Sequence, residues 1–513
     1  MGADPTGPYL LGVDIGTSST KGVLTTPDGT VLRTATRPHG VSRPRPGWVE
    51  HDPDRVWWDE FVSVTRELLT GAPAGGVPAN AVPAGAVAGV AVSGIGPCLL
   101  PTSDAGDPLR PAILYGVDTR ASAEITELNQ AYGAEALIAR GGSPLTSQAI
   151  GPKLLWLRRH EPQVWQRTRR FMMASSLLVH RLTGEYVLDH HSASQCDPLY
   201  DLTSGSWATD LADEIAPGLR LPRLHWPTEV VGRITDAAAA QTGLAAGTPV
   251  TAGTVDAWAE AASVGATRPG DLMLMYGTTM FLVQTVDRPT RHPGLWATTG
   301  VLPGSHCLAA GMATSGAVIE WFRELTGGPD YAELTAQAAA VPAGSDGLLV
   351  LPYFAGERTP IFDDQARGVI AGLTIDHGRG HLYRALLEAT AYGVRHNLTT
   401  MAEVADPARR VIAVGGGARS LWTQIVSDVT SCAQLIPEQT IGACYGDAYL
   451  AAVGVGLATT ADDWTRRAGM VRPNPGATTR YDQYYQAYRE LYPATRPITH
   501  RLAALATESA TAR

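Results

Sequence analysis

A strand, turn, strand pattern occurs twice in this sequence, about half a chain apart, and it constrains the fold more than any other feature. The first copy lies within residues 9–24, where two apolar runs flank the turn Gly16-Thr17-Ser18. The second copy lies within residues 272–283, around Gly277-Thr278-Thr279. Short apolar runs bounded by turn residues are typical of buried strands. The recurrence therefore favours two similar domains, each of which opens on a β-hairpin.

Strand-like and helix-like segments alternate through the rest of the first half. Residues 87–92 and 111–115 are apolar runs of strand length, whereas residues 122–132 and 153–159 have helical character. Alternation of this kind indicates an α/β layered fold. The fold class that we expect is therefore α/β.

Arg268-Pro269-Gly270 is the predicted boundary between the two domains. Proline and glycine end regular elements at this point, directly before the second copy of the hairpin pattern. A chain of 513 residues is long enough for more than one hydrophobic core. We expect one domain over residues 1–267 and a second over residues 268–513.

Composition excludes several classes of protein. The 40 basic and 49 acidic residues give a net charge of −9 without a basic stretch, so no nucleic-acid partner is expected. No apolar run reaches the length of a membrane-spanning helix, and the N-terminus lacks the pattern of a secretory signal. The lack of a membrane-spanning run predicts no membrane partner. The five cysteines are scattered without a CxxC pair, which favours a reduced, cytoplasmic location.

Lysine is scarce, and this makes the lysines that remain informative. Lys21 and Lys153 are the only two lysines among the 40 basic residues. A chain that otherwise uses arginine is expected to keep lysine where a compact ammonium group is needed. Chance survival is the alternative interpretation.

The turn after the first strand has the residue types of a phosphate site. Small residues allow backbone N–H groups to approach a phosphate, and hydroxyl groups add donors. Asp14, at the end of the strand, is a candidate ligand for Mg²⁺, and Lys21 is a candidate for neutralising phosphate charge. Gly415-Gly416-Gly417 follows another apolar run and is a candidate nucleotide contact. Ordinary polar turns are the alternative in each case.

Asp256 follows an apolar run and precedes an alanine-rich helical segment. A carboxylate at this position is most often a helix cap. It becomes a candidate general base if it faces a cleft.

Taken together, the motifs resemble the FGGY family of carbohydrate kinases, and within it the xylulokinase branch most of all. The resemblance runs in order from about Tyr9 to Tyr492. Its motifs are Asp14-Ile15-Gly16-Thr17-Ser18, Leu109-Arg110-Pro111-Ala112-Ile113-Leu114, Lys153-Leu154-Leu155-Trp156-Leu157, Leu182-Thr183-Gly184-Glu185, Asp256, Gly277-Thr278, Gly356-Glu357-Arg358-Thr359-Pro360, residues 368–388 and Gly415-Gly416-Gly417-Ala418-Arg419-Ser420. Lys153 begins one of these motifs, and Lys21 follows the first motif by three residues.

The resemblance implies two actin-like (ribonuclease H-like) ATPase domains, with ATP and a sugar in the cleft between them. It implies transfer of the γ-phosphate of ATP to a hydroxyl group of a small sugar, with Mg²⁺ as cofactor and a pentulose as the first expectation. A polyol or another ketose is the alternative acceptor, and the resemblance leaves a homodimer open. An actin-like ATPase that acts as a chaperone or a sensor is the non-enzyme alternative.

The resemblance also implies roles for individual residues. Asp256 resembles the catalytic aspartate that accepts the proton of the sugar hydroxyl, and Asp14 the aspartate associated with Mg²⁺. Five residues resemble the two phosphate loops: Thr17, Ser18, Lys21, Gly277 and Thr278. Five more resemble the nucleotide wall and adenosine site: Gly316, Glu320, Gly416, Gly417 and Ser420. The sugar side is expected to include Gly96, Pro97, Asp118, Arg120, Asp256 and Trp258.

The sugar side departs from the xylulokinase pattern. Ile95-Gly96-Pro97-Cys98 stands where that branch has Gln-Met-His-Gly, so Pro97 replaces a polar histidine. Tyr115-Gly116-Val117-Asp118 occupies the place of the branch's Trp-Asn-Asp motif and is one residue longer. Ala257 replaces the asparagine that follows the catalytic aspartate. A pocket that loses hydrogen-bonding partners changes its preference among hydroxyl-bearing ligands. We therefore expect D-xylulose to be a poor substrate.

The rival classes make different demands on the sequence. A chaperone would need a peptide-binding domain, and nothing after residue 500 is long enough to form one. A catalytically inactive sensor would be expected to lack Asp14 or Asp256, and both are present.

Overall fold

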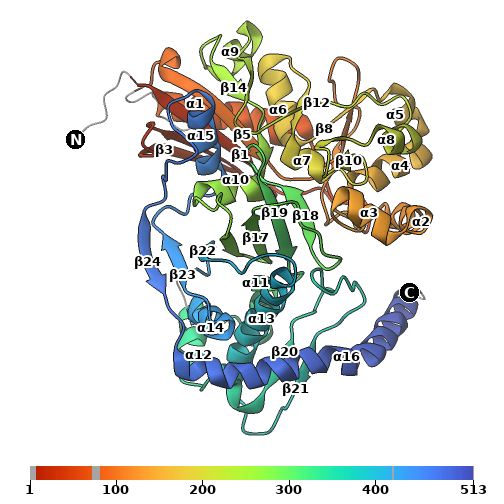
Figure 1. The fold of residues 1–513 in the computed structure, drawn as a ribbon, viewed down its shortest axis with the longest axis vertical. Coiled ribbons are helices and arrows are strands. Elements are labelled where there is room, and N and C mark those ends of the chain that lie inside the picture. Colours follow the sequence, from red (N-terminus) through yellow and green to blue (C-terminus); the bar gives the residue numbers. More distant parts are fainter. Residues whose placement is uncertain (1–6, 72–80, 419–420, 512–513) are drawn as a thin grey trace.

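The computed structural model describes residues 7–71, 81–418 and 421–511, and side chains up to residue 506. The chain forms two lobes, with the first half above and most of the second half below in the view of Figure 1. Each lobe is built around a mixed sheet of seven strands. The fold class predicted from the sequence is confirmed.

The first sheet has the spatial order β13-β14-β5-β1-β2-β3, with β15 also paired to β5. β1 and β2 form the predicted hairpin, and β1 runs parallel to β5. Its strands are β1 (Tyr9–Ile15), β2 (Ser19–Thr25), β3 (Val31–Pro38), β5 (Val87–Gly94), β13 (Val230–Arg233), β14 (Pro249–Thr251) and β15 (Thr254–Val255).

The second sheet has the order β18-β19-β17-β16-β22-β23-β24. β16 pairs antiparallel with β17 and parallel with β22, as β1 does with β2 and β5. Its strands are β16 (Asp271–Tyr276), β17 (Met280–Val286), β18 (Trp296–Thr299), β19 (His306–Gly311), β22 (Arg410–Val414), β23 (Gln434–Pro437) and β24 (Arg467–Val471). Two similar sheets are thus present, while the exact division at residues 267 and 268 stays a prediction.

Short two-stranded ladders complete the strand inventory outside the two large sheets. They are formed by β4 (Glu50–His51), β6 (Leu100–Thr102), β7 (Ala112–Ile113), β8 (Arg170–Met172), β9 (Val187–Asp189), β10 (Tyr200–Asp201), β11 (Ser206–Trp207), β12 (Arg223–His225), β20 (Leu349–Leu351) and β21 (Val369–Ala371).

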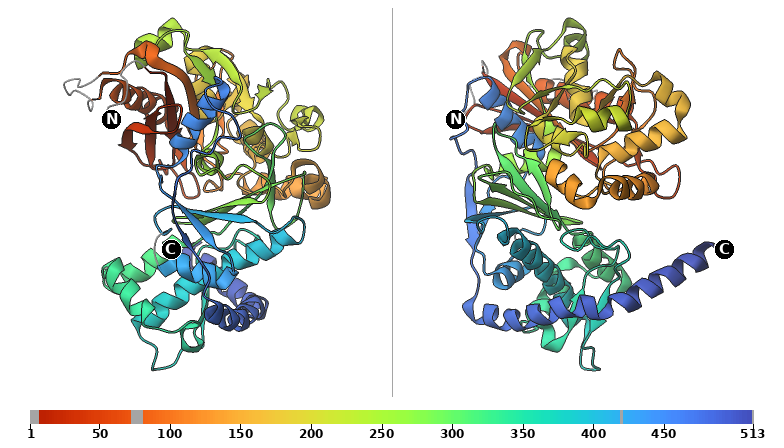
Figure 2. Two further views of the ribbon diagram at one scale, coloured as in Figure 1. Left: turned by 60° about the vertical axis from the view of Figure 1, so that its left-hand side comes forward. Right: turned by 45° about the vertical axis from the view of Figure 1, so that its right-hand side comes forward.

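Helices cover the first sheet and build the side of the upper lobe away from the N-terminus (Figure 2). Their bounds are α1 (Glu60–Thr70), α2 (Ser122–Tyr132), α3 (Ala134–Gly141), α4 (Ile150–His160), α5 (Pro162–Arg167), α6 (Ala174–Thr183), α7 (His190–Ser194), α8 (Thr209–Ile215), α9 (Asp236–Thr242) and α10 (Asp256–Ser263).

The second half contributes a further set of helices. Their bounds are α11 (Gly316–Leu325), α12 (Tyr331–Ala339), α13 (Arg379–Ala402), α14 (Leu421–Thr430), α15 (Ala443–Gly454) and α16 (Pro475–Thr511). The long helix α16 crosses the base of the lower lobe, and its C-terminal end projects from the body (Figure 1). Within the described part of the chain, no helix combines the length and apolar character needed to cross a membrane.

Helix α15 belongs to the second half of the sequence but packs on the first sheet. It contacts β1, β2 and β5, and it packs against α10 (Figure 1). Glycines permit this approach, because a Cβ at Gly12 would lie 2.0 Å from the carbonyl oxygen of Cys444. A Cβ at Gly446 would lie 1.8 Å from the carbonyl oxygen of Ala259. This packing brings the first turns of α10 and α15 beside the carboxyl end of β1.

Candidate active site

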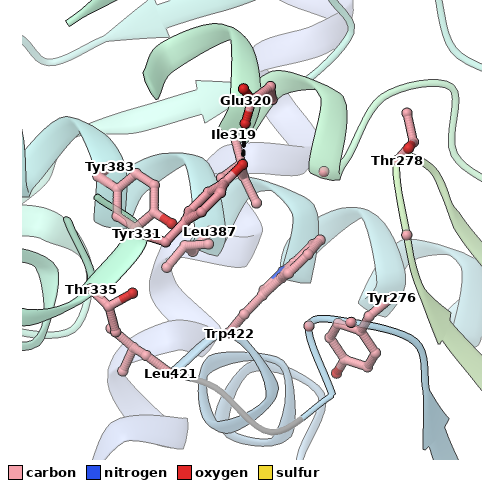
Figure 3. Close-up of a pocket in the computed structure, with 14 residues that line it drawn as sticks. Tyr276, Thr278, Ile319, Glu320, Tyr331, Thr335, Tyr383, Leu387, Leu421 and Trp422 are labelled. Atoms are coloured by element: carbon pink, nitrogen blue, oxygen red, sulfur yellow. Dashed lines mark hydrogen bonds between the residues drawn. The ribbon is translucent and has the colours of Figure 1, made fainter. Parts of the chain in front are cut away.

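A cavity of about 620 Å³ lies between the second sheet and the helices of the lower lobe (Figure 3). The predicted nucleotide residues that line it are Gly277, Thr278, Gly316, Glu320, Gly416 and Gly417. They come from three separate segments of the sequence, and the fold brings them to one place. Ser420, the remaining predicted nucleotide residue, lies outside the described residues. A cavity of this size falls within the range of small-molecule sites.

The glycines of this cavity have two different physical roles. A Cβ at Gly316 would lie 2.4 Å from the carbonyl oxygen of Gly277, so glycine is needed for α11 to begin against the β16–β17 turn. Backbone N–H groups of Gly316 and Ala317 donate to Gly277 and Thr278 across this contact. A Cβ at Gly416, by contrast, would meet no atom within 4 Å. Gly416 therefore keeps space open in the cavity rather than serving a close packing contact.

Aromatic side chains form the apolar wall, and the sequence analysis did not identify them. Tyr276 and Trp422 pack edge to face with their ring centroids 5.2 Å apart, and Tyr383 and Tyr331 line the opposite side (Figure 3). The indole N–H of Trp422 donates to the hydroxyl of Thr390 at 2.8 Å, which fixes the ring. Aromatic walls with few polar groups are typical of pockets for planar ligands.

Glu320 lies at the rim of the cavity. Arg323 and the Tyr331 hydroxyl both donate hydrogen bonds to its carboxylate, and these bonds lower the pKa of Glu320 to about 2. The ion pair with Arg323 offsets the negative charge of the carboxylate. Glu320 therefore stays ionised at neutral pH with a partner of opposite charge.

The predicted first phosphate turn connects β1 and β2 in the upper lobe. Thr17 and Ser18 lie in the turn, and Asp14 and Lys21 lie on the two strands that it joins. The hydroxyl oxygens of Thr17 and Tyr115 are 3.5 Å apart. Lys21 is exposed, whereas Asp14 is buried. The hairpin thus presents hydroxyl groups and an exposed ammonium group beside a buried carboxylate.

Asp14 belongs to a cluster of carboxylates that the sequence analysis did not foresee. The hydroxyl of Ser93 lies 2.7 Å from a carboxylate oxygen of Asp447, on α15, and 3.1 Å from one of Asp14. Burial raises the pKa of Asp14 to about 6, although Ser93, Lys21 and His39 act in the opposite direction. Burial and the Asp14 charge raise the pKa of Asp447 well above its ordinary value.

Asp256 and Glu260 extend the carboxylate cluster from α10. Asp256 is the first residue of the helix, and its carboxylate accepts from the backbone N–H of Ala257 at 2.7 Å. Burial raises its pKa well above the ordinary value, and the charges of Asp14 and Glu260 add to the effect. Burial and Asp14 also raise the pKa of Glu260 to about 7. Mutual repulsion of carboxylates at a low-dielectric site is a common feature of acid–base centres.

The Tyr115 hydroxyl interacts electrostatically with Asp256 and with a residue of the second half of the chain. The negative charge of Asp256 raises the pKa of the Tyr115 hydroxyl in addition to burial, and the positive charge of Arg358, from the second half, lowers it. Gly96 lies against Val255, the residue before Asp256, because a Cβ there would be 2.7 Å from a Val255 methyl group. The predicted Gly96-Pro97 segment is thus placed beside the strand that leads into Asp256.

Asp118 and Arg120 form a buried ion pair, and the Nη1 atom of Arg120 has no hydrogen-bonding partner among the described residues. The two side chains are fully buried and 2.7 Å apart. Asp118 also accepts from the backbone N–H of Val49, and Arg120 pairs with Glu50 and lies over the ring of Trp48. The groups named here that bind the Asp118–Arg120 pair all belong to the protein itself. The predicted contact of Asp118 and Arg120 with a sugar stays a prediction.

Trp258 is buried and packs against the first half of the chain. Its ring stacks on His191 with centroids 3.9 Å apart, and Phe281 of the second sheet packs against its edge. The tryptophan thus lies between the two lobes, beside a second and smaller cavity. Its predicted position next to a sugar stays a prediction.

Lys153, the second of the two lysines, is buried under the segment that precedes α4. Its ammonium group donates to the carbonyl oxygen of Ser147 at 2.7 Å. Burial lowers its pKa to about 8, while Cys98 and Asp118 oppose the change. Lys153 therefore anchors the chain at Ser147.

Metal binding is best judged from the donors present. Among the described residues, no group of three or more His, Cys, Asp or Glu side chains is arranged to hold a metal ion by itself. Mg²⁺ in phosphoryl-transfer sites uses one or two carboxylates together with substrate phosphates and water. Asp14, a buried carboxylate beside the phosphate turn, fits this donor set.

Comparisons with known proteins agree with this arrangement. Residues 9–265 match the N-terminal domain of the FGGY family of carbohydrate kinases, and residues 272–455 match its C-terminal domain. The chain is 29% identical to a xylulose kinase of Lactococcus lactis, over 96% of this chain and 98% of that protein. It is 30% identical to a glycerol kinase of Nocardia farcinica, over 89% of this chain and 92% of that protein.

A solved structure shows the same fold. The crystal structure of xylulose kinase from Rhodospirillum rubrum superposes with a TM-score of 0.87 at 35% sequence identity, covering 96% of this chain and 100% of that chain. The likeness spans both lobes.

Proposed function

The chain belongs to the FGGY family of carbohydrate kinases, and we propose that it transfers the γ-phosphate of ATP to a small polyhydroxy acceptor, a pentulose in the first instance. Members of this family are phosphotransferases with a hydroxyl group as acceptor, so the chain is an enzyme and not a chaperone or sensor. The acceptor and the roles of individual residues are our proposal.

The observation that carries the proposal is the position of Asp256. It lies at the start of α10, where burial, and after it the charge of Asp14, raises its pKa well above the ordinary value. Tyr115 from the first half and Arg358 from the second lie around the same space. The cavity lined by Gly277, Thr278 and the glycines after β22 is the proposed place of ATP.

The reaction requires little covalent participation from the protein. The acceptor oxygen forms a bond to the γ-phosphorus as the bond between that phosphorus and the bridging oxygen of ADP breaks. Asp256 accepts the hydroxyl proton, and its raised pKa makes it a stronger base than an exposed aspartate. Thr17, Ser18 and Thr278 donate hydrogen bonds to phosphate oxygens, and Lys21 and Arg358 offset the negative charge of the transferred group.

Asp14 is the residue that we propose to hold Mg²⁺, together with the phosphates of ATP. The ion would neutralise charge on the phosphate oxygens. The Ser93 hydroxyl, 3.1 Å from one carboxylate oxygen of Asp14 and 2.7 Å from one of Asp447, helps to hold the Asp14 side chain in place.

The acceptor follows from the relatives and from the sugar side of this chain. Similar proteins carry the names xylulose kinase and glycerol kinase, so both a pentulose and a polyol have support. Pro97 is buried at the position where a histidine would supply a polar contact. We therefore expect D-xylulose to be phosphorylated less efficiently than the preferred ketose or polyol.

A coupled assay of ADP release tests the function. The purified protein is given ATP and Mg²⁺ with each member of a panel of tetritols, pentitols, pentuloses and hexuloses, with glycerol as the shortest acceptor. Acceptor-dependent ADP release supports the proposal, and equal ATP turnover with and without every acceptor contradicts it. Efficient and selective turnover of D-xylulose would show that other residues supply the hydrogen bond that Pro97 is unable to make.

The cytoplasmic location and the homodimer considered from the sequence stay predictions.

A further inference from the structure

A second cavity, of about 40 Å³, lies where the two halves of the chain meet. The first half lines it with Gln148, Asp197 and Trp258, and the second half with Phe281, Trp296 and Thr298, among others. A water-sized group needs roughly 10–15 Å³ on this measure, so the space admits about three such groups. This is enough for the end of a hydroxylated carbon chain and too little for a nucleotide.

Four polar atoms of the lining residues, one of which is the indole nitrogen of Trp258, are buried without a hydrogen-bonding partner among the described residues. The Oδ1 atom of Asp197, the indole nitrogen of Trp296 and the hydroxyl of Thr298 make no hydrogen bond to any described residue. Burial alone raises the pKa of the Asp197 carboxyl well above its ordinary value, since no donor offsets it. Buried polar groups of this kind are uncommon unless a ligand or water satisfies them, because desolvation costs free energy.

The lining has the mixed character of a site for a polyhydroxy compound. Phe281 stacks with Trp296 and meets Trp258 edge to face, with centroid distances of 6.2 Å and 5.7 Å. Aromatic rings supply an apolar wall for C–H groups, while a carboxylate, a hydroxyl and an indole N–H supply acceptor and donor positions. A purely structural water site would not need three aromatic rings.

Two residues that line the cavity, Gln148 and Trp258, link it to the proposed transfer site. The side-chain oxygen of Gln148 accepts from the backbone N–H of Gly116 at 2.9 Å. Gly116 follows Tyr115. The charge of Asp256 raises the pKa of the Tyr115 hydroxyl, and the charge of Arg358 lowers it. Trp258 lies two residues after Asp256 on α10. Gln148 and Trp258 therefore connect the second cavity to the surroundings of the catalytic candidate.

Hydrogen bonds between the two halves hold the walls of this cavity together. The backbone N–H of Ala297 donates to Gly142 at 3.3 Å, and that of Thr299 donates to the hydroxyl of Ser194 at 3.3 Å. A ring nitrogen of His191 lies 2.8 Å from the carbonyl oxygen of Thr299. A ligand here would contact both lobes, so its binding would favour their close association.

We propose that this interlobe cavity binds the end of the acceptor remote from the phosphorylated hydroxyl, with Asp197 accepting a hydrogen bond from a distal hydroxyl group. Thr298 and Trp296 contact the same end of the acceptor. The inference rests on the proposed kinase function and names the acceptor class: neutral ketoses or polyols long enough to reach from Asp256 to Asp197. An acceptor with a distal carboxylate is disfavoured, because no lysine, arginine or histidine is among the described residues that line the cavity to balance its charge.

The test compares acceptors of different length in wild type and three variants. Asp197→Ala removes the carboxylate, Thr298→Val removes the hydroxyl with little change of shape, and Trp296→Phe removes the indole N–H. Asp213→Ala, at an exposed aspartate of α8, is the matched control. For each protein, kcat and KM are measured for the best acceptor and for the shortest acceptor that wild type phosphorylates, and the KM for ATP is measured in parallel.

We expect Asp197→Ala to lower the ratio of kcat/KM between the long and the short acceptor about tenfold or more, mainly through KM. Thr298→Val and Trp296→Phe should lower this ratio less, and Asp213→Ala should not change it. Thermal unfolding of each variant identifies those that fail to fold, and Thr298→Val keeps the test valid if Asp197→Ala does not fold.

The inference is wrong if folded variants keep the wild-type length preference, which would assign structural water to the cavity. It is also wrong if the preferred acceptor carries a distal carboxylate. If wild type phosphorylates no acceptor, the proposed function itself fails.

Discussion

Asp14 and Lys21 lie directly opposite each other in the antiparallel pair of β1 and β2. Opposed residues in such a pair project from the same face of the sheet. The carboxylate proposed for Mg²⁺ and the ammonium proposed for phosphate therefore leave the hairpin on one side, with the Gly16-Thr17-Ser18 turn between their strands.

This pairing makes the chemistry of Lys21 testable. Lys21→Ala should lower kcat/KM for ATP by about 10-fold to 100-fold, since a charge-assisted hydrogen bond to phosphate is removed. Lys21→Arg should restore only part of the activity, because a planar guanidinium cannot replace a compact ammonium in a narrow phosphate turn. Steady-state kinetics with ATP as the varied substrate measures both. Arg43→Ala, at an exposed cation, is the control. Full activity of Lys21→Arg would refute the interpretation drawn from lysine scarcity.

Asp256→Asn should reduce phosphoryl transfer by about 10²-fold to 10⁴-fold, the usual contribution of a general base. The fold should survive, because the asparagine oxygen can still accept from the N–H of Ala257. Phosphoryl transfer is measured through ADP release, and ATP binding is measured by calorimetry. Retention of half the wild-type rate would mean that Asp256 serves only as the start of α10.

Glu260→Gln should alter the pH dependence of stability in the absence of nucleotide and metal. Burial raises the folded-state pKa of Glu260 from 4.5 to about 7. The folded protein therefore binds this proton more tightly than the unfolded chain, and stability is lost as the pH rises from about 4.5 through 7. The glutamine of the variant does not ionise, so the variant does not lose stability in this pH range. Its free energy of unfolding should exceed that of wild type by about 1–3 kcal/mol at pH 8, with partial exposure of the side chain limiting the gain.

Urea unfolding at pH 4 and pH 8 measures this difference. At pH 4 the wild-type carboxyl is protonated in the folded state and largely so in the unfolded chain, so variant and wild type should differ only by the small effect of a neutral substitution. If the difference in unfolding free energy between variant and wild type is the same at both pH values, the ionised Glu260 side chain does not destabilise the folded protein.

Gly416→Leu should block the nucleotide cavity without disturbing the fold. The new side chain meets no protein atom near its Cβ, so it should enter the space that ATP needs. We expect the KM for ATP to rise tenfold or more while Tm stays within about 2 °C of wild type. Gly476→Leu, where a Cβ also meets nothing, is the control outside the cavity. An unchanged KM for ATP in the Gly416 variant would remove Gly416 from the nucleotide site.

The two hairpin turns and the glycines after β22 could be placed at strand ends from the sequence, because strand ends depend on local features. Gly277-Thr278 follows a buried strand, and Gly416-Gly417 follows another strand of the same sheet. β16 and β22 are parallel neighbours, so their carboxyl ends meet at one edge. Small residues at these strand ends indicate a site regardless of how the rest of the chain folds.

The carboxylate cluster could not be predicted in this way. Asp447 belongs to α15, which is far from Asp14 in sequence and packs on the first sheet only because Gly12 and Gly446 allow it. Nothing near residue 447 indicates such a neighbour. The aromatic wall of Tyr276 and Trp422 was missed for another reason. Aromatic residues at helical or strand spacing are usually core residues, so they do not by themselves indicate a ligand site.

Individual roles on the sugar side also depended on tertiary contacts. The contact of Asp118 and Arg120 with a sugar stays a prediction, but their pairing with each other and with Val49 and Glu50 was visible only in the fold. Asp197 had no motif to mark it, yet it lies in the interlobe cavity without a donor for its Oδ1 atom among the described residues.

The sequence by itself determined the α/β class, the duplicated hairpin and the residue types of the phosphate turns, since these follow from periodicity and local backbone needs. Which charges are paired, buried or open to a ligand was decided by the packing of distant segments, because pairing and desolvation depend on neighbours in space.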